Sequence, residues 1–277
     1  MAPLALVTGA SSGIGRACAT HLASLGFEVL AGVRDAGDAP PGIEPVRLDV
    51  TSADDIDKAA ERVGGRLDAL VNNAGIAVNG PIEVVPVDEW RRQFEVNLIG
   101  QVAVTRALLP ALINAKGRIV NMSSISGRFA LPLVAPYAAS KFALEAVSDC
   151  LRREVGPLGV RVACIEPGAI ATPVWSKSRA EGERLIEVMP ADVQRRYDRL
   201  IDAVRRQVQR MEREGLPPAA VAEVVGHAVT ATRPRTRYVI GREAQVRAVA
   251  ARLLPDRALD ALVRRALTSG GRSAARG

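Results

Sequence analysis

The chain has 277 residues, of which 48% are apolar and 24% charged, and its formal net charge is +7. This apolar content is enough for one large core and excludes a disordered or fibrous protein. Three widely spaced cysteines and two histidines argue against a disulfide framework, and we predict no metal site.

The two ends of the chain differ in character. A strand pattern begins at Leu4, which leaves no room for a signal peptide, and we find no run of about 18 uncharged apolar residues. We therefore expect a cytoplasmic protein without a membrane-spanning segment. Residues 233–277 carry eleven arginines and only three acidic residues. A solvated helix face explains this charge best, so we predict no specific nucleic-acid partner and at most weak contact with a membrane surface.

Short apolar runs alternate with longer segments of helical period as far as residue 240, which is typical of βαβ units. The predicted strands are Leu4–Thr8, Glu28–Val33, Val46–Leu48, Leu67–Asn72, Arg118–Met122, Val160–Ile165 and Arg237–Ile240. The predicted helices are 14–25, 52–63, 87–113, 137–155 and 218–231, with Ser52 as a cap. The fold class is therefore α/β, with a Rossmann-like, doubly wound parallel sheet of about seven strands in a three-layer α/β/α arrangement.

Two further segments are helical but lie outside this alternation. Residues 174–215 are charged and strandless, which indicates an insertion that covers the substrate as a lid. Residues 243–277 form a basic C-terminal extension of one or two helices, with Val246, Val249, Leu253 and Leu254 as an apolar stripe. No linker divides the chain, so we expect residues 1–277 to form a single domain.

A glycine-rich turn follows the first strand and precedes the first helix. Glycines in the pattern GxxxGxG allow a tight turn and close approach of the backbone to a pyrophosphate, beside the free N–H groups of the helix. We expect the pyrophosphate of a dinucleotide to contact Gly9, Ser11, Ser12, Gly13, Ile14 and Gly15.

The end of the second strand predicts which dinucleotide is bound. A carboxylate there binds the 2′-hydroxyl of NAD, whereas an arginine receives the 2′-phosphate of NADP. Val33 ends the strand and Arg34 follows, with Ser12 facing it, which favours NADP(H). A shift of two residues in register would place Asp35 there and favour NAD(H), so both cofactors stay open.

Three residues have the chemistry needed to move a proton at a carbonyl oxygen. Tyr137 and Lys141 are one helical turn apart and share a face. The lysine ammonium favours the phenolate and so lowers the pKa of the tyrosine, which otherwise is near 10. Ser124, on the loop after the fifth strand, is placed to hydrogen-bond the substrate oxygen.

Together these motifs resemble the short-chain dehydrogenase/reductase family in its single-domain form, over residues 4–242. The matching motifs are TGASSGIG at 8–15, Asp49-Val50, Asn72-Asn73-Ala74-Gly75, Asn97, Ser124, the Tyr137/Lys141 pair and Pro167-Gly168 with Thr172. The resemblance implies an oxidoreductase that transfers a hydride between NADP(H) or NAD(H) and a carbonyl or secondary alcohol.

The resemblance also assigns roles. Asn97 would hold a water that relays protons to Lys141, which makes a catalytic set of Asn97, Ser124, Tyr137 and Lys141. Ser124 is preferred over Ser123 because it stands thirteen residues before Tyr137. The remaining residues implied for the cofactor are Asp49, Val50, Asn73, Ala74, Gly75, Pro167, Gly168, Ile170 and Thr172, and Tyr137 and Lys141 also contact it. A homodimer or homotetramer would form through the helices of Asn97 and Tyr137, unless the C-terminal extension blocks one interface.

Glu166 stands where asparagine is commoner in the family, and this variant resembles the 17β-hydroxysteroid and retinol dehydrogenase-like branch. The branch implies a bulky apolar substrate, steroid-, retinoid- or lipid-like. The predicted pocket residues are Phe129, Leu131, Val134 and Trp175, with Leu133, Val174, Leu185, Met189, Tyr197 and Leu200 as further candidates. Packing of the lid onto the body explains these residues equally well. The alternatives are a reductase of small polar ketones and a non-catalytic dinucleotide-binding regulator.

Overall fold

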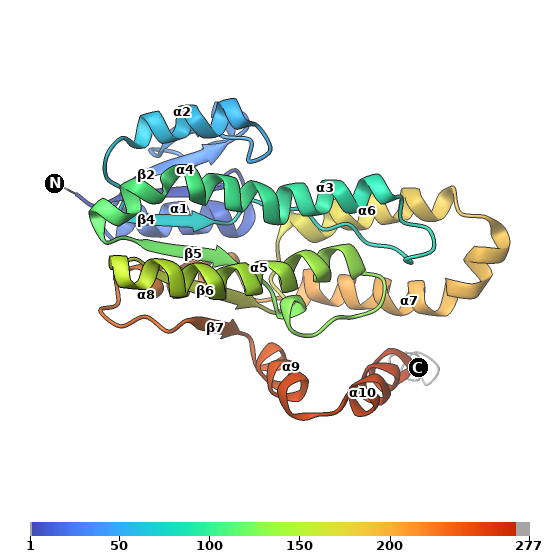
Figure 1. The fold of residues 1–277 in the computed structure, drawn as a ribbon. Helices are drawn as coiled ribbons and strands as arrows, with labels where there is room; N and C mark the ends of the chain where they lie inside the picture. The colour runs from blue at the N-terminus through green and yellow to red at the C-terminus, as the bar shows by residue number, and fades with distance from the viewer. Residues whose placement is uncertain (1, 270–277) are drawn as a thin grey trace.

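The structure, a computed structural model, describes residues 2–269 and is built on one sheet (Figure 1). The strands are β1 (Leu4–Thr8), β2 (Glu28–Val33), β3 (Glu44–Arg47), β4 (Ala69–Asn72), β5 (Arg118–Met122), β6 (Arg161–Pro167) and β7 (Arg237–Ile240). They lie in the order β3-β2-β1-β4-β5-β6-β7, and all neighbours are parallel. The predicted α/β class and doubly wound sheet are therefore confirmed.

Helices cover both faces of the sheet. On one face lie α1 (Gly13–Ser24) and α8 (Pro218–Thr230), and on the other α2 (Ala53–Val63), α4 (Gly100–Ala115) and α5 (Ala135–Val155). The position of strand β1 explains why this strand is apolar throughout. Val7 packs into the core beside α1 and α8, whereas its neighbour Leu6 packs into the core beside α2 and α4. A strand buried on both faces needs apolar residues at every position.

The predicted strand boundaries are one or two residues off at the edge strand β3 and also at the interior strands β4 and β6, the second of which continues to Pro167. Strand β3 begins at Glu44 and not at Val46, because it is an edge strand that pairs only with β2. Glu44 and Pro45 are exposed there, so they add nothing to an apolar pattern, and an edge strand tolerates the missing N–H of a proline. The fourth strand is shorter than predicted, and α5 begins two residues before Tyr137.

The predicted helix 87–113 is one long rod with an irregular middle. It consists of α3 (Val87–Phe94), a π-helical segment, η2 (Glu95–Ile99), and α4. By length and composition this rod is apolar enough to cross a membrane. Its side chains Val104, Leu108 and Leu112 are almost completely buried in the core, which accounts for its apolar character.

The insertion between β6 and α8 folds as two helices, α6 (Pro173–Glu187) and α7 (Ala191–Glu214), which extend beyond the sheet (Figure 1). Its two ends meet where Ile170 bridges to Leu216. Met189, Val193 and Ile201 form an apolar cluster against which Tyr197 and Leu133 pack. Met189, Tyr197 and Leu133 thus join the lid to the body, as the packing alternative expects.

The C-terminal extension is helical as predicted, with α9 (Arg242–Leu253) and α10 (Asp256–Ser269), but its apolar stripe is exposed. Val246, Val249 and Leu253 are more than half exposed, and Leu254 is 38% exposed. The buried residue of α9 is Ala244, which lies against Gly168. The stripe stays exposed because α9 contacts the body through the small residue Ala244 and through Arg247, whose guanidinium lies over the Phe129 ring. Residues 270–277 of the predicted extension lie outside the described part.

Candidate active site

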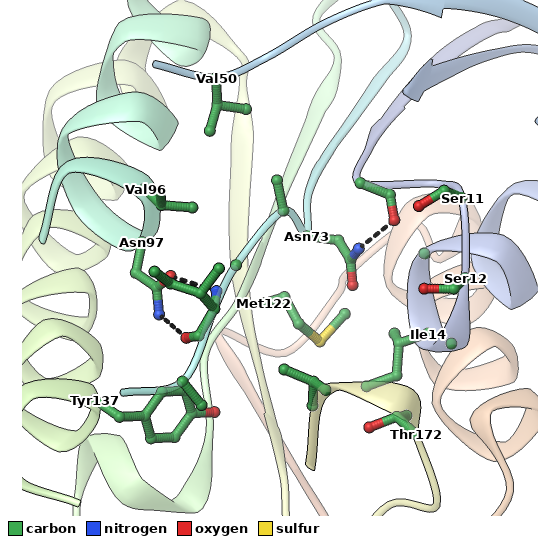
Figure 2. Close-up of a pocket in the computed structure, with 18 of the residues that line it drawn as sticks. Ser11, Ser12, Ile14, Val50, Asn73, Val96, Asn97, Met122, Tyr137 and Thr172 are labelled. Carbon is green, nitrogen blue, oxygen red and sulfur yellow. Dashed lines mark hydrogen bonds between the residues drawn. The ribbon is translucent and has the colours of Figure 1, made fainter. Parts of the chain in front are cut away.

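A cleft of about 680 Å³ opens at the carboxyl ends of the strands, where ligands of open α/β sheets bind (Figure 2). In Figure 2, Ser11, Ser12 and Ile14 lie on one side of it and Val96, Asn97 and Tyr137 on the other. Every residue predicted for the cofactor or for catalysis lines this cleft: Gly9, Ser11, Ser12, Gly13, Ile14, Gly15, Arg34, Asp49, Val50, Asn73, Ala74, Gly75, Asn97, Ser124, Tyr137, Lys141, Pro167, Gly168, Ile170 and Thr172.

The glycine-rich turn is fixed by the turn after β4. The Thr8 hydroxyl accepts hydrogen bonds from the N–H groups of Asn73 and Ala74, both at 2.9 Å. The Asn73 amide donates to the carbonyls of Thr8 and Gly9, at 3.0 and 3.2 Å. A Cβ on Gly15 would lie 2.2 Å from the Gly9 carbonyl oxygen, so the first turn of α1 sits directly against this loop. Such a cradle of backbone at a helix N-terminus fits a pyrophosphate.

Arg34 lines the cleft just after β2, where the sequence predicts that the two dinucleotides are distinguished. Strand β2 ends at Val33, and Gly32, Val33 and Arg34 all line the cleft. Asp35 does not line it, because its carboxylate caps the next turn by accepting the N–H of Gly37 at 2.9 Å. The register with Arg34 facing the cleft is therefore the one present.

Asp49 lies beside this arginine. Burial alone would raise its pKa, but hydrogen bonds from Thr51 and the charges of Arg34 and Arg47 outweigh burial and lower it. The Thr51 N–H and hydroxyl reach one Asp49 oxygen at 2.9 and 2.7 Å. Asp49 is thus a fixed, ionised acceptor beside Arg34.

Tyr137, Ser124 and Lys141 converge at the opposite end of the cleft. Tyr137 is hydrogen-bonded to Ser124. Ser124 is held by its own turn, where its hydroxyl accepts the Ser126 N–H at 3.1 Å. Lys141 is 4% exposed, and its ammonium donates to the Met122 carbonyl at 2.7 Å and lies 5.8 Å from the centre of the Tyr137 ring. Ser123 also lines the cleft, but Tyr137 pairs with Ser124.

The pKa of Tyr137 differs from the sequence-based expectation. Burial raises it, and the hydrogen bond with Ser124 offsets only part of that rise. Burial also lowers the pKa of Lys141, to about 8. The Lys141 ammonium donates its hydrogen bond to the Met122 carbonyl and not to Tyr137, so burial is the main influence on the pKa of Tyr137. Tyr137 is therefore a neutral phenol at neutral pH, the form that donates a proton.

Asn97 lies inside the π-helical segment and is completely buried. Its side-chain oxygen accepts the Ile76 N–H at 2.8 Å, and its amide donates to the Ile76 carbonyl at 3.0 Å and to Ser140 at 3.4 Å. Asn97 thereby fastens the loop after β4 to α5, next to Lys141. π-Helical turns occur frequently at functional sites.

The substrate side of the cleft departs from the predicted pocket. Phe129, Leu131 and Val134 do not line the cleft, and the side chain of Trp175 lies outside the described part. Of the further candidates, Val174 does line it, and Leu133 and Leu185 line a second, smaller cavity under the lid. The residues that the sequence reasoning missed are Ile76, Ala77, Arg92, Glu95, Val96, Met122, Ser178 and Glu181. No motif marks them, because long-range packing brings them together.

Polar contacts join the lid to the rim of the cleft. Ser178 of α6 is buried and donates to the Ala77 carbonyl at 2.6 Å, and Asn79 donates to Ser178 at 2.5 Å. Arg92 of α3 pairs with Glu181 of α6 at 3.1 Å. Within the described residues, no group of three or more His, Cys, Asp or Glu side chains could hold a metal ion.

The sequence matches known proteins along the parts that build this site. Residues 3–183 match the family model described as short chain dehydrogenase, so the chain belongs to the short-chain dehydrogenase family. It is an NAD(P)-dependent oxidoreductase that acts on CH–OH groups.

Three curated relatives show the range of this similarity. An NADPH-dependent 3-dehydrocapnine reductase of Ornithobacterium rhinotracheale is 37% identical, with 92% of this chain and 94% of the relative covered. Rat mitochondrial D-beta-hydroxybutyrate dehydrogenase is 38% identical over 84% and 75% of the two chains. Mouse retinol dehydrogenase 5 is 37% identical over 93% and 86%, which supports the predicted branch.

Solved structures agree on the fold. A short chain dehydrogenase from Burkholderia cenocepacia in complex with NADP is 28% identical, with a TM-score of 0.74 over 96% of this chain and 98% of that one. A relative from Burkholderia phymatum in complex with NAD is 26% identical, with a TM-score of 0.75 over 91% and 92%.

Proposed function

We propose that the enzyme reduces the carbonyl group of a bulky apolar molecule with NADPH, and oxidises the corresponding secondary alcohol in the reverse direction. The observation that carries this proposal is the Tyr137 hydroxyl, hydrogen-bonded to Ser124 and close to the buried Lys141, at the end of the cleft opposite the glycine-rich turn. A nicotinamide cofactor supplies the hydride when bound. A purely regulatory dinucleotide sensor would need only the glycine-rich turn.

Each catalytic side chain then has one task. Ser124 donates a hydrogen bond to the substrate oxygen and keeps it beside Tyr137. Tyr137 donates its proton to that oxygen during reduction and accepts one during oxidation. Lys141 binds the ribose hydroxyls and stabilises the phenolate left on Tyr137, and Asn97 holds the water that returns a proton from solvent.

Tyr137→Phe tests this proton transfer. We expect turnover to fall by about 10²–10⁴-fold, because the proton donor is lost, while the Kd for NADPH changes little. Steady-state reduction and fluorescence titration of NADPH measure the two quantities. Tyr197→Phe is the matched control, since Tyr197 lies on the lid and bonds Glu83 outside the cleft. Normal turnover in Tyr137→Phe would refute the assignment.

A preference for NADP(H) is supported by Arg34 in the cleft and by Asp35 turned away from it. Arg34→Ala removes the cation that would meet the 2′-phosphate, so we expect the Kd for NADPH to rise about 10- to 100-fold and that for NADH about twofold at most. Calorimetric titration with both cofactors measures this. Arg47→Ala is the control, because Arg47 pairs with Asp55 and does not line the cleft. Equal losses for both cofactors would show that the phosphate lies elsewhere.

A bulky apolar substrate is supported by Ile76, Val96 and Val174 on the cleft wall and by the similarity to a retinol dehydrogenase. The alternative, a small polar ketone, is favoured by the Arg92–Glu181 pair at the same cleft and by the similarity to a hydroxybutyrate dehydrogenase.

Reduction rates across a panel of carbonyls of increasing size discriminate the two. We expect steroid and retinoid carbonyls to exceed acetoin by at least about tenfold in kcat/KM, because each buried methylene contributes about 0.8 kcal/mol. NADPH oxidation is followed in each case, with Tyr137→Phe as the background. The opposite ranking would favour the small polar substrate.

We further propose that the single catalytic domain, residues 1–277, acts as a homodimer or homotetramer through α4 and α5, with 174–215 as its substrate lid. Val102 on α4, Ile99 just before it and Phe142 on α5 are 39–50% exposed, so these helices offer apolar side chains for contact with a second copy. A cytoplasmic location and a weak contact between the basic C-terminal extension and a membrane surface are part of the same proposal.

Phe142→Arg tests the interface. We expect the mass in solution to fall towards that of one chain, because a desolvated arginine would oppose its copy across a symmetric contact. Light scattering after size exclusion measures the mass. Ile82→Arg is the control, since Ile82 is 70% exposed and lies on a loop away from both helices. An unchanged mass of two or more chains in Phe142→Arg would exclude this face.

A further inference from the structure

A network of buried charges lies behind Lys141, on the side away from the cleft. Glu145 is on α5, one turn after Lys141, and Glu166 is on β6. Arg237 of β7 contacts both carboxylates, with its Nε at 2.9 Å from Glu145 and 3.5 Å from Glu166. Glu166 is 0% exposed and Glu145 is 7% exposed, so neither charge is shielded by water. Charges buried this deeply persist only when they are paired.

Two further contacts fix the network. Arg128, just after the short turn Ile125–Gly127, pairs with Glu166 at 2.8 Å. Gly127 lets this turn pack closely against α5, because a Cβ at Gly127 would lie 3.1 Å from the Lys141 carbonyl oxygen and 3.2 Å from the Glu145 Cγ. Arg237 also binds Asp149 of α5 at 2.8 Å. The loop that carries Ser124, helix α5 and strand β7 are thus held together around Glu145.

This network acts electrostatically on Lys141. Burial lowers the pKa of the lysine to about 8, and the nearby carboxylate of Glu145 opposes that change. Burial and Glu145 together raise the pKa of Glu166 to about 7, against the charges of Arg128 and Arg237. Burial, with a smaller contribution from Glu145, raises the pKa of the Cys164 thiol to about 12, so this thiol is neutral.

The groups around Lys141 come from every element packed near it. They are Tyr137, Glu145 and Asp149 of α5, Cys164 and Glu166 of β6, Arg237 of β7, Arg128 after the 125–127 turn, and Arg92 and Glu95 across the cleft. Among these groups, Glu145 is the acid that lies one helical turn after Lys141 on α5.

We propose that Glu145, fixed by Arg237, is a positioning residue whose negative charge keeps Lys141 protonated while Tyr137 exchanges its proton with the substrate. This inference rests on the proposed function for its role in the reaction, but the coupling of Glu145 to Lys141 exists without any substrate.

Glu145→Gln keeps the shape of the side chain and removes its charge. Loss of a nearby negative charge favours the neutral lysine, so we expect the protonation midpoint of Lys141 to fall by about one pH unit. Arg237→Gln removes a positive charge and should move the midpoint in the opposite direction. A purely structural role would not produce shifts of opposite sign.

The midpoint is measured without turnover, by acetylation with acetic anhydride at a series of pH values and mass spectrometry of the peptides. The chain has only four lysines, and the exposed Lys58 and Lys116 serve as internal references. Glu154→Gln is the matched control, because Glu154 is exposed on the same helix. Thermal unfolding checks that each variant is folded. If Arg237→Gln fails to fold, the Lys141 midpoint in Glu145→Gln alone tests the inference.

The second measurement is the pH profile of kcat/KM for reduction. We expect its alkaline limb to move to lower pH in Glu145→Gln by the same amount as the Lys141 midpoint. An unchanged midpoint in folded Glu145→Gln would overturn the inference, and a shifted midpoint with an unchanged profile would overturn the role in the reaction. If no carbonyl is reduced by the wild type although the midpoints shift, the proposed function fails and the coupling stands.

Discussion

The contact between the turn after β1 and the turn after β4 is the constraint on which the rest of the site depends. Thr8 and Asn73 exchange four hydrogen bonds there with backbone groups of the opposite turn. From this contact the loop continues to Ile76, which Asn97 binds on both its N–H and its carbonyl. Asn97 in turn reaches Ser140, the residue before Lys141. Side chain-to-backbone hydrogen bonds, completed by the side-chain contact between Asn97 and Ser140, therefore fix the glycine-rich turn and helix α5 relative to each other.

The sequence predicts much of this architecture, because the decisive signals are local. Glycines at 9, 13 and 15 and the Tyr137/Lys141 pair each specify a short backbone geometry, and all of them line one cleft. The features that the sequence did not predict depend on contacts between residues far apart in the chain. The π-helical turn at Asn97 leaves no mark on a helical pattern, and the outward stripe of α9 depends on how little of that helix meets the body. Phe129 is a further case, because its contact with Arg247 depends on the placement of a helix more than a hundred residues later.

The electrostatics of the site follow from burial. A lysine that is almost wholly buried is strongly disfavoured as a cation unless a carbonyl or a carboxylate stabilises it. The Met122 carbonyl provides the first and Glu145 the second. Two buried acids then need cations of their own, which Arg237 and Arg128 supply. Glu166, where asparagine is commoner in the family, thus belongs to the same set of buried charges as Lys141.

The lid brings a different kind of constraint to the same cleft. Its apolar side chains are largely used to pack against Leu133 and the body, whereas its polar side chains Ser178 and Glu181 face the cleft wall and bind Ala77 and Arg92. Four residues that line this side of the cleft, Ala77, Arg92, Ser178 and Glu181, therefore also join the lid to the body. To move away from the body, α6 would have to lose a buried hydrogen bond of Ser178 and an ion pair of Arg92. Ala77 lies on the loop that Asn97 fastens, and Arg92 lies on the rod that carries Asn97, so the contacts that hold α6 and those that hold α5 meet at the same loop.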